Sequence, residues 1–165
     1  MSAVASSRFT FPNPVNEVSA RLVAAGVVLM ALAVAAFGQT WILVPLAYGF
    51  LARVAAGPRY SPLGLFVTRV AVPRLGIAPR NVPGPPKRFA QGMGAVISVA
   101  AVVAAFGFGE EGIARVLAAL ILVAATLESV IALCIGCKIF AGLMRLGVVP
   151  ERICVECEDL GARRT

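Results

Sequence analysis

Four cysteines form two pairs of identical spacing, and they are the residues best suited to chemistry. They are Cys134 and Cys137 in the stretch CIGC, and Cys154 and Cys157 in the stretch CVEC. A CxxC pair brings two sulfur atoms within reach of each other, so it serves as a redox dithiol or as half of a tetrahedral zinc site. Three interpretations stay open: thiol redox or sulfur transfer with all four cysteines catalytic, zinc bound by the same four, and no chemical role.

The spacing between the pairs is typical of a zinc site, whereas their position in the chain is less so. Sixteen residues separate Cys137 from Cys154, within the range of about 15 to 20 found between paired zinc ligands. Gly147 and Pro150 would let the tail fold back toward the first pair. Cys134 and Cys137, however, are predicted at the end of an apolar helix, where cysteine is also a common packing residue. The chain contains no histidine, which excludes imidazole metal sites and histidine-based catalysis.

Glu128 is the ionisable residue inside the last apolar run, where a carboxylate is costly and indicates a function. We take it as a candidate buried acid, with a bond to Arg21, Arg53 or a neighbouring helix as the structural alternative. On a continuous helix Glu128 would point about 120° away from Cys134, which disfavours direct proton exchange. Lys138 would favour a thiolate at the first pair and a helix C-terminus would oppose it, so the sign of the thiol pKa shift stays open.

These residues must be positioned by helices in a membrane. The chain has 165 residues, of which 59% are hydrophobic and 14% charged, too apolar a balance for the core of one small soluble domain. We therefore predict an all-α membrane protein, a bundle of four transmembrane helices with the lipid bilayer as its surroundings. The first eleven residues lack the pattern of a cleaved signal peptide.

Uncharged runs and helix signals give the expected boundaries. Asn13 is a predicted N-cap with Pro14 at the first helical position. Between the second and third spans, Leu63 to Val72 is either a short interfacial amphipathic helix or an irregular loop. The expected organisation is a cytoplasmic N-terminal segment (1–12), a transmembrane domain (13–146) and a cytoplasmic cysteine-containing tail (147–165). The transmembrane domain has spans at about 18–37, 41–56, 89–109 and 113–137, and its last helix continues to about 146. A basic Pro-rich cytoplasmic connection (57–88) joins its second and third spans.

The charges then predict an orientation. The net charge is +7, and with four spans every lysine and arginine except Arg115 falls on one face of the membrane. The positive-inside rule makes that face cytoplasmic. We expect a multi-pass protein of the cell (inner or plasma) membrane with both termini in the cytoplasm, and no nucleic-acid partner. Cytoplasmic thiols are kept reduced, which argues against a permanent structural disulfide.

Several stretches resemble a known family. They are FPNPVNEVSARLVAAG, GPRYSPLGLFVTRV, VPGPPKRFAQ, CIGC and VPERICVEC, and together they are similar to the DUF4395 family, a domain of unknown function in actinobacterial integral membrane proteins. The chain also resembles two-span membrane domains fused to rhodaneses. The resemblance implies association with thioredoxin-like or rhodanese-type (sulfurtransferase) soluble proteins, and it implies no catalytic residues.

Three hypotheses follow. The first is a membrane protein that performs thiol redox or sulfur transfer with a soluble partner at Cys134, Cys137, Cys154 and Cys157, with Glu128 as a buried acid. The second is a non-enzymatic membrane scaffold with structural zinc at the four cysteines. The third is a small transporter of a sulfur compound, which would require a homo-oligomer because four helices enclose only a narrow pore.

Overall fold

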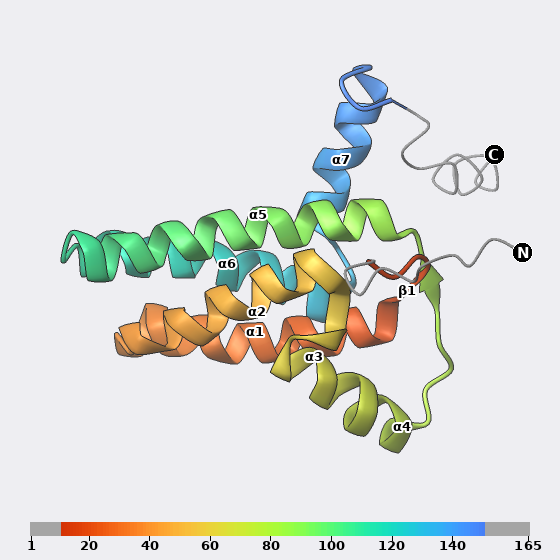
Figure 1. Cartoon of the computed structure of the whole chain (residues 1–165), viewed down its shortest axis with the longest axis horizontal. Coiled ribbons are helices and arrows are strands. Elements are labelled where there is room, and N and C mark those ends of the chain that lie inside the picture. Colours follow the sequence, from red (N-terminus) through yellow and green to blue (C-terminus); the bar gives the residue numbers. More distant parts are fainter. Residues whose placement is uncertain (1–10, 151–165) are drawn as a thin grey trace, which may run out of the picture.

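The computed structural model describes residues 11–150, and its main body is a bundle of four long helices (Figure 1). Within these residues, four helical stretches are long and apolar enough to cross a membrane, and they are Glu17–Phe37, Thr40–Leu75, Gly84–Gly107 and Glu111–Ile131. The predicted class, an all-α membrane bundle, is confirmed.

Two tight turns lie at the same end of the bundle, and they join the first helix to the second and the third helix to the fourth. Helix α1 spans Glu17–Phe37, and Gly38 ends it in a left-handed conformation with φ of 67°. A 3-10 turn at Thr40–Ile42 leads into α2, Leu43–Ala56. Helix α5, Gly84–Val102, continues through a π-helical turn at Val103–Gly107, and α6 spans Glu111–Ile131. Arg115 of α6 donates hydrogen bonds to the carbonyl oxygens of Ala35 and Ala36 and so satisfies the end of α1.

Small side chains allow the helices to pack closely. Helix α1 packs mainly along α6, and α2 along α5. Fully buried alanines lie at these contacts, among them Ala31, Ala101, Ala114 and Ala118. Small residues let two helix backbones approach each other, which is the usual basis of helix association in lipid. Large apolar side chains such as Leu29, Val96 and Val130 point outward instead, as expected for a surface that faces acyl chains.

The segment between α2 and α5 is helical where it could have been a loop. It contains α3 (Pro62–Phe66), a π-helical turn (Val67–Ala71) and α4 (Val72–Leu75). Ser61 caps this segment by accepting a hydrogen bond from the Gly64 N–H at 3.3 Å. The helical alternative expected for Leu63 to Val72 is therefore correct. In Figure 1 this segment leaves the bundle at the end opposite the tight turns.

The predicted start of α1 was wrong by three residues. Asn16, not Asn13, is the N-cap, and its side chain accepts the Val18 N–H at 3.0 Å. Asn13 instead accepts the N–H of Gly84 at 2.9 Å, at the start of α5. A two-residue antiparallel ladder between β1 (Val15–Asn16) and β2 (Asn81–Val82) joins the same two segments.

The third helix begins earlier than its predicted start at about residue 89. It begins at Gly84 with prolines in its first turn. That turn needs no intrahelical N–H donors, so Pro85 and Pro86 are compatible with it.

The last helix was predicted as continuous to about residue 146, and this prediction was wrong. Helix α6 ends at Ile131, where Ala132 adopts a left-handed conformation with φ of 56°. Arg21 of α1 donates to the carbonyl oxygens of Ser129 and Val130, which supplies partners for the end of α6. A separate helix, α7 (Ile135–Arg145), then leaves across the direction of the bundle (Figure 1). Neither glycine nor proline marks the break, so the sequence carried no local signal for it.

Candidate functional site

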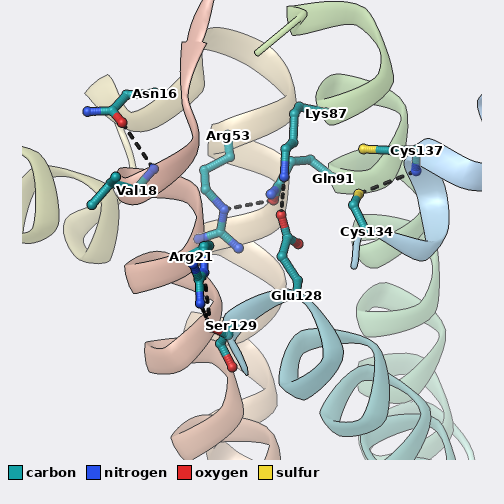
Figure 2. A network of polar contacts seen from close by, with 10 residues as sticks. All are labelled: Asn16, Val18, Arg21, Arg53, Lys87, Gln91, Glu128, Ser129, Cys134 and Cys137. Atoms are coloured by element: carbon teal, nitrogen blue, oxygen red, sulfur yellow. Dashed lines mark hydrogen bonds and ion pairs between the residues drawn. The ribbon is translucent and has the colours of Figure 1, made fainter. Parts of the chain in front are cut away.

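The first cysteine pair lies at the N-terminus of a helix. Cys134 is the N-cap of α7, and its sulfur accepts a hydrogen bond from the Cys137 N–H at 3.3 Å (Figure 2). Both are free thiols; Cys134 is 8% exposed and Cys137 is partly exposed. Gly136, between them, lies so close to Ala90 of α5 that a Cβ there would collide with it. This contact holds the segment that contains Cys134 and Cys137 against α5.

The break before α7 reverses the expected influence of the helix dipole. A continuous helix would have placed the first pair at a C-terminus, which disfavours a thiolate, whereas a helix N-terminus favours one. The hydrogen bond between the two thiols lowers the pKa of Cys134 below its ordinary value, and the nearby Lys87 ammonium acts in the same direction, against burial and the Glu128 carboxylate. The same hydrogen bond, with burial, raises the pKa of Cys137. Cys134 is therefore the cysteine favoured as thiolate.

A buried cluster of polar side chains stands beside the cysteines (Figure 2). Lys87 of α5 forms an ion pair with Glu128 of α6, and their side chains are only 9% and 14% exposed. Arg53 of α2 donates from Nε to Gln91 Oε1 at 2.8 Å and from Nη1 to Ser61 Oγ at 3.2 Å. These residues bring charges from three different helices into the interior of the bundle.

As the structural alternative to a functional role, Glu128 was predicted to bond to Arg21, Arg53 or a neighbouring helix. Its partner, Lys87, lies on a neighbouring helix, α5. Its ion-pair partner Lys87 was assigned by sequence to the connecting segment and was therefore missed. The early start of α5 at Gly84 brings Lys87 into the first turn of that helix. The sequence did contain a signal for this early helix start. Lys87 follows the stretch GPP, and prolines are common in a first helical turn. Glu17, the first residue of α1, pairs with Arg80 at 3.2 Å.

A cavity connects the polar cluster to the first cysteine pair. Its volume is about 100 Å³, and Arg53, Gln91, Glu128 and Cys134 all line it. Glu128 and Cys134 thus share one space, contrary to the separation expected for a continuous helix. Most of the remaining wall is apolar and comes from four helices, with Val23, Val27, Phe50, Met93, Ile97, Leu120 and Ile121 among its residues.

The candidate residues therefore fall into two groups. Cys134, Cys137 and Glu128 lie together at the end of the bundle from which α7 leaves. Cys154 and Cys157 lie outside the described residues. Zinc binding by all four cysteines stays a prediction, because two of its ligands lie outside the described part of the chain.

Comparison with known proteins identifies the family. The family model described as a domain of unknown function, DUF4395, matches residues 15–145. The chain belongs to the DUF4395 family. Neither a curated protein nor a solved structure gives a significant match. The DUF4395 region includes the bundle, the polar cluster and the pair Cys134 and Cys137, and it ends before Cys154.

Proposed function

We propose that this DUF4395 protein exchanges electrons with a soluble dithiol protein of the thioredoxin-like type through Cys134 and Cys137. The observation that carries the proposal is the hydrogen bond of 3.3 Å from the Cys137 N–H to the Cys134 sulfur at the start of α7. A thiolate at a helix N-terminus is both a better leaving group and more abundant at neutral pH than an ordinary cysteine. Transient catalytic disulfides are also the kind that occurs in the cytoplasm.

The two cysteines have different roles in the proposed exchange. In the oxidised form, a partner thiolate attacks the sulfur of Cys137, which is the more exposed of the two. A mixed disulfide forms, the Cys134–Cys137 bond breaks, and Cys134 leaves as a thiolate that the Cys137 N–H stabilises. The second partner thiol then displaces Cys137. The partner dithiol is oxidised to a disulfide and the membrane protein is left as a dithiol.

The lysine and glutamate beside the pair have supporting roles. The Lys87 ammonium favours the Cys134 thiolate electrostatically, while Glu128 balances the charge of Lys87 inside the bundle. Glu128 is thus assigned as a positioning residue for Lys87. The basic end of the bundle faces the cytoplasm in this proposal, by the positive-inside rule, so a soluble cytoplasmic partner reaches α7.

Trapping of the mixed disulfide tests the proposal. The full-length protein is prepared with Cys154→Ser and Cys157→Ser, so that only the first pair remains, and is incubated with a thioredoxin that keeps only its attacking cysteine, present as a mixed disulfide with thionitrobenzoate. We expect Cys134→Ser to accumulate a disulfide between Cys137 and thioredoxin, because Cys137 displaces thionitrobenzoate and neither protein then has a resolving thiol. Cys137→Ser should give at least several-fold less, since Cys134 is buried. Absence of any mixed disulfide or Cys134–Cys137 disulfide would end the proposal.

Zinc analysis separates this function from the scaffold alternative. The wild-type protein is purified without chelator and its metal content is measured. About one zinc per chain, lost when either cysteine pair is replaced by serine, would support the structural zinc site instead. Less than a tenth of a zinc per chain is expected if the pairs are redox dithiols.

A further inference from the structure

Arg53 carries a buried donor that its neighbours do not satisfy. Its side chain belongs to a residue that is 5% exposed, and among residues 11–150 its Nη2 atom has no hydrogen-bond partner. Lys87 and Glu128 form an ion pair, whereas the Arg53 guanidinium lies over the Phe50 ring, 4.6 Å from its centroid. A buried donor without an acceptor is costly, and more so when it is charged, so the arrangement is suited to a ligand that supplies an acceptor.

One cavity is lined by both Arg53 and the reactive Cys134. In Figure 2 the Lys87–Glu128 ion pair lies between the Arg53 guanidinium and Cys134. Most of the wall is apolar, including Phe50 and Ile97. A mostly apolar chamber whose polar wall includes the Arg53 guanidinium favours an apolar ring that bears an oxygen acceptor over a hydrated ion, whose desolvation would be costly.

The wall of the cavity includes an exposed side chain of the lipid-facing surface. Leu120 of α6 lines the cavity and is 54% exposed. Met93 and Ile97 of α5 line the same cavity. Because both helices belong to the membrane-spanning bundle, a ligand dissolved in the bilayer can reach the cavity at Leu120 without crossing the aqueous phase.

We propose that the cavity binds the head group of a lipid-soluble quinone, which accepts the electrons of the Cys134–Cys137 dithiol. This inference depends on the proposed dithiol function and names its second substrate. Two S–H bonds break and one S–S bond forms; the two electrons and two protons pass to the quinone, whose carbonyl oxygens become the hydroxyls of a quinol. The Arg53 guanidinium donates to one carbonyl and stabilises the negative charge that develops on it during reduction.

The size of the cavity sets how the head group would bind. The cavity has a volume of about 100 Å³, whereas a closed cavity of about 150 Å³ accommodates a benzene ring. A cavity of this size takes one edge of a quinone ring, with its carbonyl, and not the whole ring. The rest of the ring and the isoprenoid tail extend past Leu120 into lipid.

A rate comparison tests the proposal. The Cys154→Ser, Cys157→Ser protein is reduced, placed in lipid nanodiscs and mixed with decylubiquinone, whose fully substituted ring does not alkylate thiols. Quinone absorbance and the Cys134–Cys137 disulfide, measured by mass spectrometry, should change together, with one quinone reduced per dithiol. We expect Leu120→Trp, which blocks the opening, to lower the ratio of the quinone rate to the rate with the water-soluble oxidant diamide at least tenfold.

Matched variants and a second oxidant distinguish the possible failures. Val123→Trp adds the same bulk to an exposed position of α6 that does not line the cavity, and its ratio should stay within twofold of the starting protein. Arg53→Met should lower the ratio at least tenfold. Oxidation by diamide without oxidation by quinone, or a quinone rate equal in Leu120→Trp and Val123→Trp, overturns the quinone site alone. No Cys134–Cys137 disulfide with either oxidant overturns the dithiol function itself.

Discussion

Lys87 and Glu128 form an ion pair inside the bundle although 41 positions separate them in the chain. Lys87 is near the start of α5 and Glu128 near the end of α6, so the pair links these two helices at the end of the bundle that holds the cysteines. Because little of either side chain is exposed, each charge depends on the other for its stability in the interior.

Removal of one partner should therefore destabilise the protein more than removal of both. Lys87→Met leaves the Glu128 carboxylate unpaired, at an expected cost of about 3–5 kcal/mol. The double variant with Glu128→Leu should recover most of that loss, which a double-mutant cycle of thermal unfolding in detergent would measure. Arg80→Met is the control, since Arg80 pairs with Glu17 at a surface where its side chain is 79% exposed; it should cost less than about 1 kcal/mol. Equal losses of stability in Lys87→Met and Arg80→Met would contradict the assignment of Lys87 and Glu128 as a buried ion pair.

The pH dependence of cysteine alkylation should separate the two thiols. An ordinary cysteine has a pKa of about 8.5, and its rate of alkylation by iodoacetamide is half-maximal at that pH. The pKa of Cys134 is lowered, so its rate should be half-maximal at a lower pH. The pKa of Cys137 is raised, so its rate should be half-maximal at a higher pH. Lys87→Met should move the Cys134 midpoint upward, because the Lys87 ammonium favours the thiolate. Lys138→Met is the control: Lys138 is exposed, so solvent screens its charge, contrary to the influence expected from the sequence, and the midpoint should stay unchanged. Peptide mass spectrometry in the Cys154→Ser, Cys157→Ser background assigns the rates.

Much of the bundle was predictable because lipid imposes strong rules on sequence. Long uncharged runs located the spans. The charge pattern grouped the basic residues at one end, where α3, α4 and α7 also lie (Figure 1). The candidate residues Cys134, Cys137 and Glu128 could be selected from residue type and position alone.

The geometry of the site was less predictable, since it depends on contacts between distant segments. The end of α6 is stabilised by Arg21, more than a hundred residues earlier, and no residue near Ala132 signals the break. Without that break Cys134 would not be the N-cap of α7. A prediction that missed the break could therefore not give the direction in which the helix dipole shifts the Cys134 pKa. The burial of Lys87 likewise depends on Asn13, which accepts the Gly84 N–H at the start of α5.

The break at Ala132 gives a stabilising substitution. Ala132 has φ of 56°, a left-handed conformation that costs an L-residue about 1–2 kcal/mol and glycine much less. Ala132→Gly should raise the stability of the protein by about 0.5–1 kcal/mol, seen as a higher unfolding temperature in detergent. Ala119→Gly, in the middle of α6, should lower the stability by a similar amount. A loss in both variants would mean that α6 continues past Ile131.

The orientation of the protein can be tested with single cysteines in a cysteine-free background. Gly112→Cys lies near the tight turn between α5 and α6, and Arg74→Cys lies at the end of α4; both positions are exposed. With the basic end in the cytoplasm, a membrane-impermeant maleimide should label Gly112→Cys in intact cells and label Arg74→Cys only after lysis. The reverse pattern would place the CxxC pair on the outer face and exclude a cytoplasmic partner.

The seat of α7 against α5 should control the chemistry of the cysteine pair. Gly136 lies between Cys134 and Cys137, and a Cβ at this position would collide with the backbone and side chain of Ala90. Gly136→Ala should therefore push α7 away from α5, weaken the electrostatic influence of Lys87 on Cys134, and raise the alkylation midpoint of Cys134. Gly142→Ala lies on the same helix with no atom within 4 Å of its added Cβ, so it should leave the midpoint unchanged and stabilise α7 by up to about 1 kcal/mol. If both variants behave alike, contact with α5 does not determine the reactivity of Cys134.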